Sequence, residues 1–154
     1  DISLIQAHDA YKAYHTAFPE IQEAWKEITR TVRKTSTLHT PLYRRQIYIG
    51  RIDEEVLDSI IAFVPQSTIG DKVSSVIYEC HSDMEWPSSA QVVLNIHDAL
   101  VATHKVEDEE VVTRIMKTHA ESPIIIRGHP VCIPTEFKHS KPDEKGVHRW
   151  STLA

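Results

Sequence analysis

The sequence predicts an α+β fold in which helices pack on a mostly antiparallel sheet. Three observations favour this class. Apolar residues at helical spacing dominate the first half of the chain, and two short apolar runs flank a polar dipeptide at residues 97–98. Two further apolar segments follow, over residues 123–126 and 131–133. A length of 154 residues with 41% hydrophobic and 25% charged residues is typical of one globular domain. We therefore expect residues 1–154 to form a single domain or a fragment of a larger one.

The chain is expected to begin with two helices, over residues 2–17 and 20–34. The apolar residues of the second helix recur at helical spacing and share one face: Ile21, Trp25, Ile28 and Val32. The next segment, residues 37–50, is poor in helix formers, and we expect it to form a hairpin or extended arm that carries Arg44 and Arg45.

Two more helices are expected on either side of Pro65, over residues 53–63 and 67–83, because proline disrupts a helix interior. Asp53 is the expected N-cap of the first of these. After them, the apolar runs 92–96 and 99–102 are expected to form buried strands.

The polar pair His97-Asp98 would then lie at the tip of a tight hairpin. A helix over residues 107–120 and a strand region over residues 123–133 complete the chain before a polar tail.

Composition excludes several classes of protein. No apolar stretch has the length of a membrane span, and the spacing of Cys80 and Cys132 fits a reducing compartment better than a disulfide framework. Only four glycines are present, which excludes the usual glycine-rich phosphate loops. A formal net charge of −5 argues against a free-standing nucleic-acid binder, although it allows a piece whose basic groove is completed by another segment.

Asp98 is the strongest candidate for chemistry. A carboxylate displayed rigidly where two strands meet is well placed to bind Mg²⁺, and metal-assisted phosphoryl transfer needs such carboxylates. The alternative is a polar turn, in which aspartate is chosen for hydrogen bonds to its own backbone.

Gln66, Arg44 and Arg45 are candidates for nucleic-acid contacts. A glutamine amide can donate to the acceptors that every base presents in the minor groove, and guanidinium groups suit phosphates. Gln66 could instead cap the helix after Pro65, and the arginines could instead form ordinary surface ion pairs.

Six stretches, in this order, resemble the C-terminal palm region of the family A DNA polymerases, with the phage-type members closest. They are similar to the helix pair after the fingers, the arginine-rich Thr-x-Gly-Arg-x-Arg region, the glutamine segment, motif C, the last strand and the tail of the family: residues 14–21, 38–45, 65–71, 94–101, 133–136 and 146–150. The resemblance spans nearly the whole chain. It implies the C-terminal half of a polymerase palm, which works in the cytoplasm of a bacterial or phage-infected cell.

The resemblance also implies roles for individual residues. Asp98 would be the motif C aspartate that binds catalytic Mg²⁺, with His97 beside the primer terminus. Gln66 would probe the minor groove of primer-template DNA, and Arg44 and Arg45 would contact its backbone. The motif A aspartate and the fingers helix that grips the deoxynucleoside triphosphate lie upstream in the family. We therefore expect this chain to form half of an active site and to need an upstream polymerase segment, without a membrane anchor.

The sequence departs from the family pattern in three places. Ala99 follows Asp98 where the family usually has Glu or Ser, and no glycine occurs between Thr40 and Arg44. On the helix before Gln66, Asp58 and Ala62 replace the arginine and asparagine of bacterial members. Two other functions remain open. A His-Asp metal-dependent phosphohydrolase would need His97-Asp98 on a helix among further ligands, and a non-catalytic accessory module would dock on a partner through an exposed apolar face.

Overall fold

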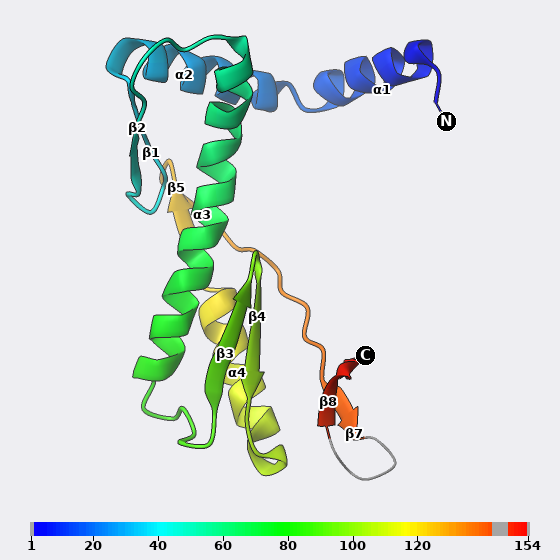
Figure 1. The fold of residues 1–154 in the computed structure, drawn as a ribbon, viewed down its shortest axis with the longest axis vertical. Helices are drawn as coiled ribbons and strands as arrows, with labels where there is room; N and C mark the ends of the chain where they lie inside the picture. The colour runs from blue at the N-terminus through cyan, green and yellow to red at the C-terminus, as the bar shows by residue number, and fades with distance from the viewer. Residues whose placement is uncertain (1, 143–147, 154) are drawn as a thin grey trace. The chain divides into compact units, whose positions relative to one another are not determined.

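The computed structural model describes residues 2–142 and 148–153, and its fold is α+β, as the sequence predicts (Figure 1). The described strands pair in four separate two-stranded antiparallel sheets. The chain divides into two compact units, residues 1–71 and 72–154. None of the described helices combines the length and apolar character needed to cross a lipid bilayer.

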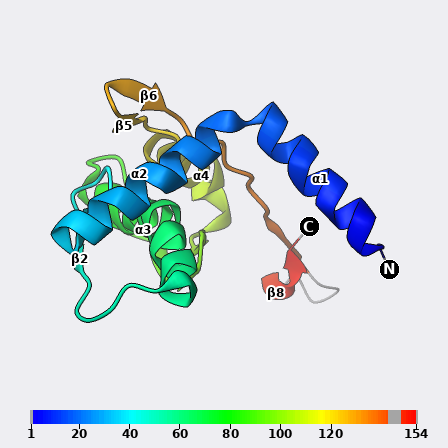
Figure 2. The ribbon, with the colours of Figure 1, turned by 90° about the horizontal axis from the view of Figure 1, so that it is seen from above.

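The first unit begins with helices α1 (Leu4–Ala17) and α2 (Pro19–Thr35), which meet at an angle at Phe18 (Figure 2). Ser3 forms a capping box with Gln6, which satisfies free backbone donors at the start of α1. Pro19 begins α2 because proline lacks the amide hydrogen that a first turn leaves unpaired. Residue Ser36, in a left-handed conformation, ends the helix.

The expected arm is a hairpin of strands β1 (Thr37–His39) and β2 (Arg45–Ile47), which confirms the prediction for this segment. It packs with α2 and the first part of helix α3 (Glu54–Ser82). The buried residues of this core come from all three elements: Val32, Leu38, Leu57 and Ile60.

Helix α3 corrects the expectation of two helices separated by Pro65. It runs without a break from Glu54 to Ser82 with Pro65 inside it, and Asp53 caps its start by accepting a hydrogen bond from the Val56 amide at 3.2 Å. Phe63 and Val64, before the proline, pack against the first core, and Val76 and Cys80, after it, are buried. We attribute the continuous helix to this packing on both sides of a residue that local propensity disfavours.

The second unit contains the end of α3, the hairpin of β3 (Gln91–Ile96) and β4 (Ala99–Thr103), and helix α4 (Glu109–Ala120). A single turn of 3-10 helix, Val106–Asp108, leads into α4. The core of this unit is built on three buried residues of α3 and α4: Val76, Cys80 and Ile115. Leu100 of β4 packs against them.

The expected burial of β3 and β4 is wrong for most of the hairpin. Leu94 is 50% exposed and Val93 is 46% exposed. A two-stranded sheet has two faces, and Leu100 of β4 packs against the core of this unit. The apolar runs predict the strands correctly, but their composition does not reveal which face is covered.

Two short hairpins complete the second unit. Strands β5 (Ile124–Ile126) and β6 (His129–Val131) confirm the predicted strand region, and strands β7 (Ser140–Pro142) and β8 (His148–Leu153) form a hairpin where a polar tail was expected. The buried ammonium group of Lys72 donates to the carbonyl of His119 at 2.8 Å, which satisfies an acceptor at the end of α4.

Candidate metal and nucleic-acid-binding sites

His97 and Asp98 are the two turn residues of the β3–β4 hairpin. The strand register pairs Ile96 with Ala99, so the dipeptide forms the tip, as the sequence predicts. His97 has φ 57°, a left-handed backbone conformation that tight hairpin turns require. The short turn therefore fixes the direction in which both side chains leave the sheet.

The carboxylate of Asp98 is exposed, and within residues 2–142 and 148–153 it makes no hydrogen bond or ion pair. The described residues also contain no group of three or more His, Cys, Asp or Glu side chains arranged to hold a metal ion. Asp98 fits the role of one oxygen ligand for Mg²⁺, because its carboxylate is accessible and unpaired. Mg²⁺ commonly takes its remaining ligands from water and substrate phosphates.

Gln66 lies in the interior of α3, one residue after Pro65, with its side chain exposed. This placement excludes the alternative in which Gln66 caps a new helix. Its amide is accessible to a ligand, as the proposed minor-groove contact requires.

Arg44 and Arg45 are both exposed residues of the arm. Arg45 lies in β2 opposite His39. Arg44 lies just before that strand, and its guanidinium Nε donates to the Asp71 carboxylate at 2.6 Å, with a second contact from Nη2 to the same oxygen. Asp71 is on α3, five residues after Gln66. Within the first unit, the structure therefore attaches the arginine arm to the helix that carries Gln66.

Asp71 and Thr40 are two residues of this site to which the sequence reasoning gave no role. Thr40 is buried, and its hydroxyl donates to Asp71 at 3.3 Å and accepts from the Arg44 amide at 3.0 Å. Both residues lie in stretches that resemble the polymerase family, and this resemblance was the feature of the sequence that could have pointed to them. Sequence spacing could not show that a chain separation of 31 residues closes into a contact.

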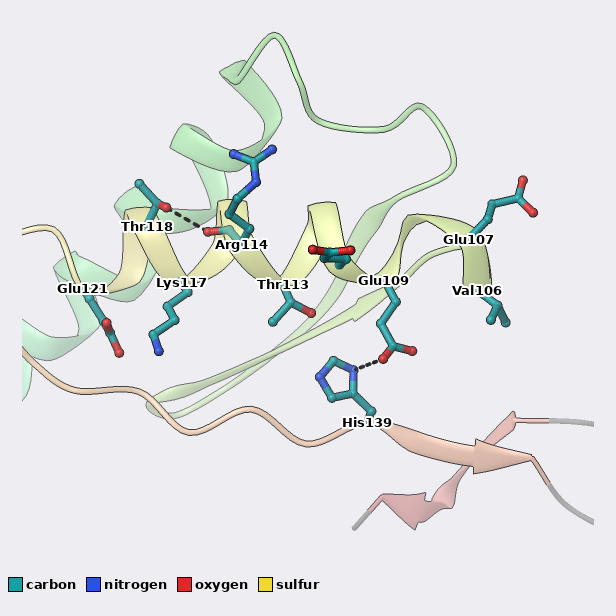
Figure 3. Close-up of a pocket in the computed structure, with 10 residues that line it drawn as sticks. Val106, Glu107, Glu109, Thr113, Arg114, Lys117, Thr118, Glu121 and His139 are labelled. Carbon is teal, nitrogen blue, oxygen red and sulfur yellow. Dashed lines mark hydrogen bonds and ion pairs between the residues drawn. The ribbon is translucent and has the colours of Figure 1, made fainter.

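A groove of about 960 Å³ lies along α4 in the second unit (Figure 3). It is lined by acidic residues near the start of the helix, by Arg114 and Lys117 further along and by Glu121 just after its end. His139 forms an ion pair with Glu109 at 3.6 Å. None of the residues that the sequence marks as functional lines this groove. The volume of this groove is therefore no evidence that it takes part in the chemistry expected at Asp98.

Comparison with known proteins does not identify a family for this chain. No protein-family model matches its sequence, and no curated protein matches it.

Proposed function

We propose that this chain is the C-terminal palm portion of a template-directed DNA polymerase, and that Asp98 supplies one of its metal-binding carboxylates. The observation that carries the proposal is the position of Asp98, exposed and unpaired among the described residues at the tip of a two-residue turn. Because residues 94–101 resemble motif C, we infer that the carboxylate at this position binds a catalytic metal ion.

The proposed reaction is attack of a primer 3′ hydroxyl on the α-phosphate of a deoxynucleoside triphosphate. Bound Mg²⁺ would stabilise the attacking and leaving oxygens of this displacement. Asp98 contributes a hard oxygen ligand, and the adjacent His97 lies beside the primer terminus. Gln66 donates to the minor groove of the primer-template, and Arg44 and Arg45 contact its phosphates.

The proposal includes an upstream polymerase segment that carries the motif A aspartate and the fingers helix. The exposed apolar residues of β3 support the need for a partner segment, because a two-stranded hairpin is marginal in water without further cover. The enzyme would act in the cytoplasm of a bacterial or phage-infected cell.

The same exposed strand favours a second candidate, a non-catalytic module that docks on a partner. A His-Asp phosphohydrolase lacks support, since His97-Asp98 lies in a turn rather than on a helix.

Primer extension tests the proposal. We expect no extension by the chain alone, and Asp98-dependent extension when the polypeptide encoded upstream of it is added. The variant Asp98→Ala should lower extension at least a hundredfold, whereas Glu107→Gln, at another exposed carboxylate of the same unit, should leave it unchanged. Extension by the lone chain, or equal extension by the Asp98→Ala and parent proteins, would show that the proposal is wrong.

Metal binding can be tested on the chain itself. Mn²⁺ replaces Mg²⁺ at oxygen sites and broadens the NMR signals of nearby nuclei, so we expect broadening centred on the amides of His97, Asp98 and Ala99. The variant Asp98→Asn should abolish this broadening, and Glu107→Gln should retain it. Persistence of the same broadening in Asp98→Asn would exclude Asp98 as the ligand.

A further inference from the structure

Among the described residues, the guanidinium group of Arg44 is held from one side by the carboxylate of Asp71. Nε and Nη2 both contact Oδ1 of Asp71, and Nε lies 2.6 Å from that oxygen. The Asp71 side chain is 15% exposed, whereas the Arg44 side chain is 53% exposed. Among the described residues, none forms a hydrogen bond with Nη1 of Arg44. The carboxylate therefore occupies the inner edge of the guanidinium and leaves its outer N–H groups available.

A tight turn fixes the backbone from which Arg44 projects. The Thr40 amide donates to the Arg44 carbonyl at 2.9 Å, and the Tyr43 amide donates to the Thr40 carbonyl at 2.9 Å. The Thr40 hydroxyl accepts from the Arg44 amide at 3.0 Å and donates to Oδ2 of Asp71 at 3.3 Å. The buried Thr40 hydroxyl thus forms hydrogen bonds both with the backbone of Arg44 and with the carboxylate that holds the Arg44 side chain.

This arrangement suits recognition of a phosphate. The fork of N–H groups on a guanidinium matches two phosphate oxygens, and a long side chain that is already ordered loses less entropy when it binds. A carboxylate on the inner edge lowers the local positive charge, but its repulsion of a ligand on the outer edge is weakened by solvent, because the arginine is half exposed. We therefore expect the gain from holding Arg44 in a fixed orientation to exceed the repulsion between Asp71 and the phosphate.

We propose that Asp71, together with Thr40, is a positioning residue that holds Arg44 so that its outer edge binds a phosphate of primer-template DNA. That the phosphate belongs to primer-template DNA rests on the proposed function. The positioning role of Asp71 is inferred from the hydrogen bonds that join Arg44, Asp71 and Thr40.

The test measures binding of the full chain to a fluorescein-labelled primer-template duplex by anisotropy over a range of salt concentrations. Asp71→Asn should weaken binding about tenfold, even though it makes the protein more positive. The slope of log affinity against log salt should fall by about one, as expected for one lost phosphate contact. A role confined to folding would not change this slope.

Glu54→Gln is the matched control. Glu54 pairs with Arg33 at 3.5 Å in the same unit, and Arg33 is 52% exposed, so this variant removes a carboxylate from a similar arginine and changes the net charge equally. We expect its affinity for the duplex to equal or slightly exceed that of the parent chain. Binding by Asp71→Asn that is as tight as binding by Glu54→Gln would overturn the proposal.

Double variants separate positioning from a general loss of structure. In an Arg44→Gln background, Asp71→Asn should cause no further loss of affinity, because its effect acts through Arg44. Arg44→Lys keeps the charge but lacks the fork, so it should bind as weakly as Asp71→Asn. If Asp71→Asn fails to fold, as judged by circular dichroism, Thr40→Val replaces it with the same expected loss of affinity and slope.

This experiment is independent of the test of catalysis. The positioning role is measured by Asp71-dependent binding, and the polymerase function is measured by Asp98-dependent extension. Absence of duplex binding by the parent chain at low salt would overturn the positioning role without bearing on extension by the reconstituted enzyme.

Discussion

The imidazole of His119 joins α4 to the residue that follows α3, because its Nε2 lies 3.0 Å from Oδ2 of Asp83. Its Nδ1 lies 3.4 Å from Glu79 of α3. Hydrogen bonds from the Glu85 backbone amide and then from His119 lower the pKa of Asp83 below its ordinary value of 3.8.

This pKa shift predicts acid sensitivity of the second unit. A carboxylate whose pKa is lower in the folded state stabilises the fold above its unfolded pKa, and this contribution is lost as the pH falls through the folded pKa. We expect the melting temperature, measured by circular dichroism between pH 6 and pH 2.5, to fall less steeply for Asp83→Asn than for the parent chain. Glu107→Gln should follow the parent, and an unchanged pH profile in Asp83→Asn would contradict the prediction.

Burial predicts the cost of truncating the second core. Ile115 is 1% exposed and packs with Val76 and Cys80, so Ile115→Ala should lower the free energy of unfolding by about 2–5 kcal/mol. Ile125 is 59% exposed, and Ile125→Ala should change it by less than about 0.5 kcal/mol. Urea unfolding of both variants measures this difference. Similar losses in the two would be inconsistent with the described core.

Pro65 predicts a stabilising substitution. It lies inside α3, where it cannot donate the backbone hydrogen bond that a helix interior requires. Pro65→Ala should raise the free energy of unfolding, by up to about 3 kcal/mol. Tyr78→Ala, at an exposed position of the same helix, should change it by less than about 0.5 kcal/mol. A lower melting temperature for Pro65→Ala would show that the proline is required by its surroundings.

The two cysteines should react with thiol reagents at very different rates. Cys132 is exposed, whereas Cys80 is buried. Burial first, and then the charges of Glu79 and Asp83, raise the pKa of Cys80 to about 11. Because the thiolate is the reactive form, one thiol should react quickly at pH 8 and the other only on unfolding. Cys132→Ser should remove the fast reaction, and the prediction fails if Cys80→Ser removes it instead.

Local patterns predicted most of the elements of this fold. The spacing of apolar residues in α2, the aspartate before α3 and the two apolar runs around His97-Asp98 each depend on neighbours within a few residues. The exposed tip at Asp98 was predictable for the same reason, since a two-residue connection between paired strands leaves little choice of conformation.

Other features depended on contacts that sequence order does not reveal. The helix expected to end before Pro65 continues to Ser82, and it is packed on both sides of the proline, through Phe63 and Val64 before it and Val76 after it. The division between the two units falls between Asp71 and Lys72, inside α3, where no change of composition marks it.

The sequence by itself determined the α+β class, the hairpin that displays Asp98 and the exposed arginines of the arm. Tertiary structure alone decided that Arg44 is held by Asp71, that α3 is continuous, and that β3 leaves much of its apolar surface exposed. The physical reason is range: turns and helical periodicity arise from neighbouring residues, whereas ion pairs and burial depend on segments that meet only after the chain has folded.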